Sequence, residues 1–214
     1  MYVVSEEGGN YLVEFPIVEL KEGDIYEEKV SMKVDRNGRS LEPSRFATLD
    51  QAVSAAAGSL FALADRIEAM LDGLEYALES DRRVEPTEIY DLSYLVHSLY
   101  GHASSLRSLS LQLKALGLIR PRAFEAAKAA FRRASALRRS LFDLRLLYLS
   151  QIQNSINTSM RRMTLVGTIA LPAILISSIY GMNLSHLPLA DHPLAVFALM
   201  ALATAVFALI TYKM

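Results

Sequence analysis

The stretch MTLVGTIALPAILISSIYGMN, residues 163–183, is followed after a short segment by HPLAVFALMALATAVFALITY, residues 192–212. Neither stretch contains an aspartate, glutamate, lysine or arginine. About 20 consecutive apolar residues are what an α-helix needs to cross the hydrocarbon core of a bilayer, at about 1.5 Å per residue. The pair therefore predicts a helical hairpin through a membrane, with spans at 163–183 and 193–212 joined by an external loop at 184–192.

The charged residues are distributed unevenly along the chain. Residues 1–91 hold 20 of the 23 acidic residues and 9 of the 22 basic ones. The remaining, mostly basic part leads directly into the first apolar span, which favours an electrostatic relationship with the acidic half over nucleic-acid binding. The chain has no cysteine, which excludes disulfides and thiolate metal sites.

The segment 1–45 predicts a small β-rich element. YLVEFPIV (11–18) and IYEEKVSMKV (25–34) are rich in strand-forming residues and are separated by the turn sequence KEGD. A third strand near the start of the chain is possible. The opening sequence MYVVSEEGGN lacks the features of a signal peptide, so membrane insertion is expected to depend on the C-terminal spans.

The segment 46–118 predicts an antiparallel pair of helices. Leucine and alanine recur at helical spacing from about Thr48 to Ser80, and a second periodic stretch runs from about Thr87 to Leu116. Thr48 or Asp50 is expected to cap the first helix, and Gly117 to end the second. Two helices of similar length with a short connection normally pack side by side in opposite directions.

A stalk helix at 119–162 is predicted to continue without interruption into the first span. From Pro121 onward the sequence has no break, and Pro172 lies inside the span, so a single helix of about 60 residues would be about 90 Å long. Leu137, Leu141 and Leu144 begin a heptad-like seam that turns polar toward the membrane. This pattern predicts packing between copies of the helix around enclosed water.

The flanks of the two spans predict the orientation. Arg161 and Arg162 precede the first span, Lys213 follows the second, and the loop 184–192 has neither lysine nor arginine. The positive-inside rule then predicts a two-span protein of the cell membrane with both termini in the cytoplasm.

The first span ends in Tyr180-Gly181-Met182-Asn183, and the segment NTSMRRMTLVGTIALPAILISSIYGMN (157–183) resembles the signature region of the CorA family of divalent metal ion transporters. The resemblance extends over roughly 120–214. It implies a mainly α membrane protein, a homopentameric funnel, and a cytoplasmic N-terminal domain that is shorter than in full-length relatives. It also implies Mg²⁺ influx driven by the membrane potential, cobalt transport as a related activity, and no enzymatic function.

Gly181, Met182 and Asn183 are the selectivity filter that the resemblance implies. Mg²⁺ is small, prefers six oxygen ligands and gives up its water reluctantly. A ring of Asn183 side-chain carbonyls, one from each subunit, can hydrogen-bond the hydration shell of the ion. Gly181 is expected to let the backbone turn, and Met182 to pack behind the turn.

The same resemblance indicates which residues line the pore. Asn157 matches an inner polar ring and is a second candidate metal contact, while two methionines match a hydrophobic constriction that excludes water. The alternatives are threonine hydroxyls bonded to their own helix and methionines in ordinary packing. The predicted pore-lining residues are Asn157, Met160, Met163, Thr164, Thr168, Leu171 and Ser178.

An acidic face on the first long helix is a candidate regulatory site for cytoplasmic Mg²⁺. It is predicted to face the basic residues Arg132, Arg133, Arg138, Arg139 and Arg145 of the stalk, and solvated faces are the alternative. The face comprises Asp65, Glu68, Asp72, Glu75 and Glu79.

Three other functions are weighed against Mg²⁺ conduction. Zinc-transporting relatives share the architecture, and the loop histidines His186 and His192 suit Zn²⁺, so Zn²⁺, Co²⁺ or Ni²⁺ is an alternative cargo. A non-conducting, membrane-anchored coiled-coil scaffold is a second alternative. An enzyme is the third, and neither a Ser/His/Asp arrangement nor a phosphate loop of the G-x-x-x-x-G-K type supports it.

Overall fold

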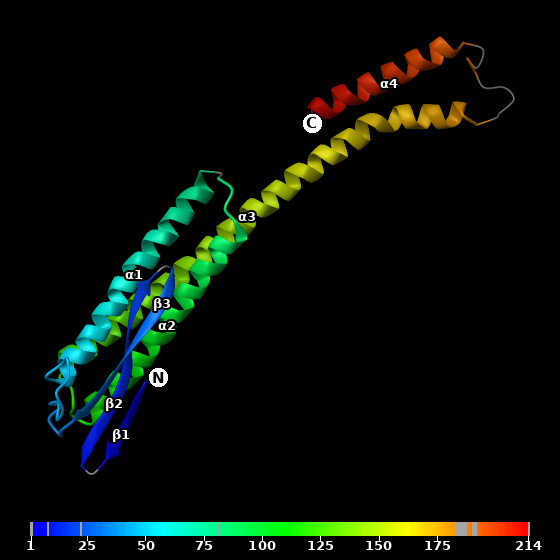
Figure 1. Cartoon of the computed structure of the whole chain (residues 1–214). Coiled ribbons are helices and arrows are strands. Elements are labelled where there is room, and N and C mark those ends of the chain that lie inside the picture. The colour runs from blue at the N-terminus through cyan, green and yellow to red at the C-terminus, as the bar shows by residue number, and fades with distance from the viewer. Residues whose placement is uncertain are drawn as a thin grey trace. The chain divides into compact units, whose positions relative to one another are not determined.

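The computed structural model describes residues 2–7, 9–21, 23–80, 82–182, 188–189 and 192–213. The chain divides into two compact units, Met1–Leu149 and Ser150–Met214, which are described separately. The first unit holds a small sheet, two helices and the first part of the third helix, and the second holds the apolar end of the third helix and the fourth helix (Figure 1).

The sheet of the first unit is a three-stranded antiparallel meander. Its strands β1 (Val3–Glu7), β2 (Asn10–Lys21) and β3 (Asp24–Val34) are ordered β1-β2-β3. Gly9 and Gly23 adopt φ angles of +86° and +88° in the two hairpin turns, a conformation that favours glycine. The two strands predicted from composition are present, and the possible third strand is β1.

The helices α1 (Leu49–Glu79) and α2 (Pro86–Ala115) form the predicted pair. The Thr48 side chain accepts a hydrogen bond from the amide of Gln51 and so caps α1. Just after the C-terminal end of α2, Gly117 has a φ of +74°, and the amide of Leu118 donates a hydrogen bond to the carbonyl of Leu113. Both the cap and the glycine stop were predicted from the sequence.

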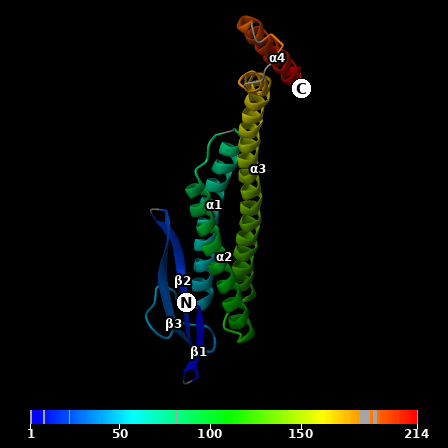
Figure 2. The same cartoon turned by 90° about the vertical axis from the view of Figure 1, so that its right-hand side faces the viewer.

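The first unit is layered, with the sheet on one side of α1 and α2 and the helix α3 (Pro121–Tyr180) on the other (Figure 2). Val13, Phe15 and Met32 of the sheet are buried against the helix pair. The amide of Val18 donates to the hydroxyl of Ser59 in α1, and the guanidinium of Arg66 donates to the carbonyl of Leu20. Apolar contact and these bonds together hold the long β2 strand on α1.

The start of α3 is fastened to the start of α1. The Asp50 carboxylate accepts a hydrogen bond from the amide of Arg120 at 2.7 Å and lies 3.7 Å from its guanidinium. Asp50 therefore satisfies a free amide at the start of α3, rather than capping α1. Nearby, Gly38 has a φ of +72°, and a Cβ placed there would lie 2.2 Å from the carbonyl oxygen of Leu118. Only glycine allows this close approach of the loop after β3 to the α2–α3 turn.

The predicted leucine seam of the stalk is occupied within the chain itself. Leu137, Leu141 and Leu144 are buried in the core that α3 shares with the rest of the first unit. The expectation that this seam joins separate copies is therefore wrong for these positions, because α1 and α2 already supply the apolar partners. On another face of α3, Phe142 and Leu146 remain exposed.

A repeating contact joins α2 to α3, and we call it the cation–aromatic ladder. In each of its three steps a cationic group lies over an aromatic ring of the facing helix, 4.5–4.7 Å from the ring centroid. The steps advance by seven residues on both helices, in opposite directions, so they share one antiparallel register. The three pairs are Lys114 with Phe124, Arg107 with Phe131, and Arg138 with Tyr100.

Candidate functional site

The second unit consists of the C-terminal part of α3 and the helix α4 (Pro193–Lys213). Both helices are long and apolar enough to cross a membrane, and only 6% of the residues in each span-length stretch are buried. In a soluble protein such helices would form the core and be mostly buried. Their exposure indicates that lipid or other protein surfaces cover them.

Six of the seven predicted pore-lining residues follow one side of α3. At about 100° per residue, Asn157, Met160, Thr164, Thr168, Leu171 and Ser178 fall within an arc of roughly 80°. All six are exposed except Thr168, which is half-buried. Met163 is also exposed but lies about 60° outside this arc.

Pro172 interrupts the hydrogen bonding of α3 within this stretch. Because proline has no amide hydrogen, it cannot donate the helical bond to the carbonyl of Thr168, four residues earlier. The helix continues through this position to Tyr180. A polar backbone oxygen is thereby left without its usual helical donor in the middle of an apolar stretch.

The helix ends at Tyr180, immediately before the glycine of the predicted filter. The amide of Gly181 still bonds the carbonyl of Ser177 at 2.8 Å, and the amide of Met182 makes a shorter-range bond to Ile179. A Cβ at Gly181 would lie 3.1 Å from the Ser177 carbonyl oxygen, and Gly181 does not adopt a positive φ. The glycine thus permits tight closure of the last turn without entering the left-handed region.

Asn183, the central residue of the predicted filter, lies outside the described residues, as do His186 and Asp191. The hydroxyl of Tyr180, before Asn183 in the chain, donates to the carbonyl of Pro188, after it, at 2.6 Å. This bond ties the last residue of α3 to the segment that leads to α4.

The predicted acidic face lies on α1 of the first unit, and part of it contacts the stalk helix. Arg133 pairs with Asp65 at 3.3 Å and also with Glu68. Its Nε atom is buried without a partner among the described residues. Arg133 thus forms the predicted contact, whereas no ion pair of Arg132, Arg138, Arg139 or Arg145 to this face occurs in the described parts of the chain.

Farther along the face, Asp72 and Glu75 line a small pocket of about 160 Å³ that Asp143 of α3 also borders. Glu68 lines the same pocket, whereas Glu79 lies beyond it. Within the described ranges, no three histidine, aspartate or glutamate side chains are grouped closely enough to hold a metal ion. The pocket concentrates negative charge without forming a complete coordination shell.

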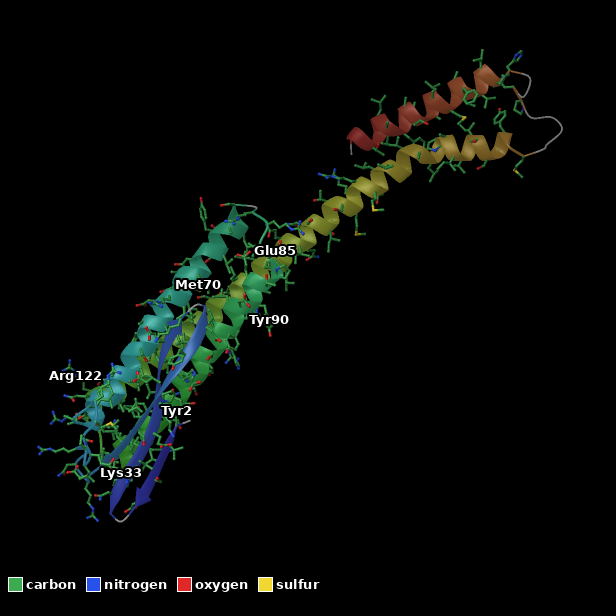
Figure 3. All side chains as sticks on the ribbon, in the orientation of Figure 1. Tyr2, Lys33, Met70, Glu85, Tyr90 and Arg122 are labelled. Atoms are coloured by element: carbon green, nitrogen blue, oxygen red, sulfur yellow. The ribbon has the colours of Figure 1, made fainter. Side chains whose placement is uncertain are left out.

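A half-buried histidine, His102, connects the sheet to α2. The hydroxyl of Tyr2 lies 3.3 Å from Nδ1 of His102, and the carboxylate of Glu27 lies 3.7 Å from Nε2; Figure 3 labels Tyr2. Burial lowers the pKa of His102, and Glu27 opposes that shift. Sequence reasoning missed this contact, because it depends on the packing of the N-terminal strand against α2.

Comparison with known proteins identifies the family. A family model described as "CorA-like Mg2+ transporter protein" matches residues 25–214. The solved structure of the CorA magnesium transporter from Methanocaldococcus jannaschii superposes with a TM-score of 0.68 at 19% sequence identity, covering 99% of this chain and 77% of that chain. Comparison with curated proteins gave no match.

Proposed function

The chain belongs to the CorA-like Mg²⁺ transporter family, and on that premise we propose that it is a channel for Mg²⁺ formed by five copies of the chain. In this proposal the copies gather their α3 helices around a water-filled axis. Influx is driven by the membrane potential, which contributes about 2.3 kcal/mol per elementary charge per 100 mV. Both termini lie in the cytoplasm, and the stalk at 119–162 leads from the cytoplasmic unit to the span at 163–183.

One observation carries the proposal: Thr164, Thr168 and Ser178 share one side of a span-length helix that is largely exposed, whereas Ser177 lies outside that side. Placing Thr164 and Ser178 against lipid tails would be costly, whereas facing water or partner helices satisfies them. A ring of copies turned toward a common axis provides that water. Thr168, whose carbonyl lacks its helical donor at Pro172, belongs to the same arc.

At the outer end of the pathway, a ring of Asn183 amides selects the hydrated ion. Neutral carbonyl oxygens can accept hydrogen bonds from the water shell of Mg²⁺ without stripping it. Gly181 and Met182 complete this filter, the glycine by allowing the last helical turn to close tightly. Asn157 forms a second polar ring at the inner end, and Met160 provides a constriction that excludes water.

Ion flux into proteoliposomes tests the proposal. The wild-type chain should conduct Mg²⁺, and parallel measurements with Co²⁺, Ni²⁺ and Zn²⁺ establish its preferred cargo. Asn183→Ala should lower the Mg²⁺ flux at least tenfold, because each subunit then lacks its filter amide. Asn37→Ala, in a loop of the first unit, is the matched control and should leave the flux unchanged.

Each outcome of this experiment has a clear meaning. A wild-type chain that conducts none of the four ions would contradict the channel and favour a membrane-anchored scaffold. A wild-type flux that survives Asn183→Ala would leave the channel standing and remove its proposed filter. Preferred flux of Zn²⁺ would change the cargo alone.

The acidic pocket on α1 is proposed as the place where cytoplasmic Mg²⁺ acts on the channel. Asp72 and Glu75 remain without a described ion pair, whereas Asp65 and Glu68 are engaged by Arg133. The double substitution Asp72→Asn with Glu75→Gln removes both charges and should raise the internal Mg²⁺ concentration that half-inhibits flux several-fold. An unchanged dose response would remove this regulatory role.

A further inference from the structure

The register of the cation–aromatic ladder between α2 and α3 predicts a fourth step, at which no cation–aromatic pair forms. Seven residues beyond the pair Tyr100 and Arg138, the facing positions are Ser93 of α2 and Arg145 of α3. Ser93 has no ring, and its hydroxyl donates to the carbonyl of Ile89 in its own helix. The cation of a fourth step is therefore present, but its aromatic partner is missing.

A cavity of about 450 Å³ opens at this fourth step, and both Ser93 and Arg145 line it. Its volume lies in the range of small-molecule sites, which is roughly 300–1,000 Å³. Tyr90, Tyr94 and Phe142 form its aromatic walls. Tyr90 lies on α2 and is 74% exposed, so the ring is accessible from solvent (Figure 3).

The charges around the cavity are mostly positive. Arg138 borders it on the side of the ladder, and an adjoining hollow shares Arg138 and Phe142 and adds Arg139. Asp143 is the acidic residue among those that line the hollow. Arg139 and Arg145 form no ion pair within the described parts of the chain. Two guanidinium groups, those of Arg138 and Arg145, thus line the cavity with the aromatic walls, and that of Arg139 lines the adjoining hollow.

We propose that this fourth step binds a nucleotide. Its base takes the position of the missing ring, stacked under the guanidinium of Arg145 and against the tyrosine walls. Bases stack on aromatic side chains and on arginine planes with little dependence on sequence. The phosphates pair with Arg138 and Arg139, because the planar guanidinium binds phosphate oxygens in pairs. A purely apolar ligand would leave these charges without a role.

Equilibrium binding of radiolabelled ATP to the full-length protein in detergent tests the proposal. EDTA is included so that a metal ion does not bridge the nucleotide to the acidic face of α1. ATP should bind saturably, and adenosine and inorganic tripolyphosphate should each compete at least tenfold more weakly than unlabelled ATP. Absence of saturable binding, as when a second copy covers the cavity, would overturn the site. Equal competition by tripolyphosphate would overturn the stacking.

Two variants locate the binding. Ser93→Phe places a protein ring in the missing position and should weaken ATP binding at least tenfold, while Ser108→Phe, at an exposed position of α2, should not. Arg145→Gln keeps the cavity open and should weaken ATP binding at least fivefold, which gives a second reading if Ser93→Phe folds poorly. ATP binding that is unaltered in Arg145→Gln would overturn the assignment. Ion flux is not measured, so this test is independent of the proposed transport function.

Discussion

The two units of the chain differ in where their apolar side chains lie: the first unit buries them and the second exposes them. In the first unit, apolar side chains from three helices and a sheet are buried in one core. In the second, α4 and the end of α3 expose side chains of the same kind along almost their whole length. The first unit therefore completes its core within one chain, whereas the second leaves its apolar side chains to be covered by lipid or other protein surfaces.

The largest expected difference between the units follows from truncating one leucine in each. Leu106 is 0% exposed and Leu202 is 65% exposed. Leu106→Ala should lower the free energy of unfolding by about 2–5 kcal/mol, since it leaves a cavity. Leu202→Ala should change it by less than about 0.5 kcal/mol. Chemical denaturation in detergent, followed by circular dichroism, measures both, and equal losses would break the contrast.

A smaller difference is expected from adding one methyl group to a glycine in each unit. Gly38→Ala should lower the free energy of unfolding by about 1–3 kcal/mol, because its φ is positive and its Cβ would meet Leu118. A Cβ added at Gly167 would meet no atom within 4 Å, and the residue lies inside a helix. Gly167→Ala should therefore raise the free energy of unfolding by about 0.5–1 kcal/mol. Thermal unfolding of both variants checks the opposite signs. A stabilising Gly38→Ala would show that the loop after β3 does not hold the α2–α3 turn.

The smallest expected effect is the response of the first unit to pH through His102. Burial lowers its pKa in the folded chain, so the unfolded chain takes up a proton first as pH falls below about 6.5. The titration of His102 should therefore leave the free energy of unfolding unchanged well above that pH and lower it below that pH. His102→Gln should flatten this decrease, and His97→Gln, an exposed control on the same helix, should not. An unchanged slope in His102→Gln would place the acid sensitivity elsewhere.

Much of the architecture could be predicted because single residues mark its boundaries. Thr48, Gly117 and Pro121 each act through local backbone geometry, so the helix ends they specify need no tertiary information. The two apolar stretches could likewise be recognised from length alone. The family could be recognised because the Tyr-Gly-Met-Asn sequence stands at the end of a proline-containing span.

The contacts between helices could not be predicted in the same way. Periodicity showed that Leu137 and Leu141 face a partner, but it did not show that the partner lies in the same chain. Of the five stalk arginines expected to meet the acidic face, Arg133 does so, because the register between α1 and α3 decides which charges meet. The ladder shows a seven-residue spacing in both helices, but its meaning requires knowing which helices are neighbours.

The proline within α3 has a consequence for experiments that dissect the chain by side-chain truncation. The carbonyl oxygen of residue 168 lacks a helical hydrogen-bond donor whatever side chain stands there, because the missing amide hydrogen belongs to Pro172. An alanine scan of the helix would therefore remove every hydroxyl and amide side chain along its polar side and still leave this oxygen in place. Its contribution becomes measurable when Pro172 itself is replaced and the helix regains a donor.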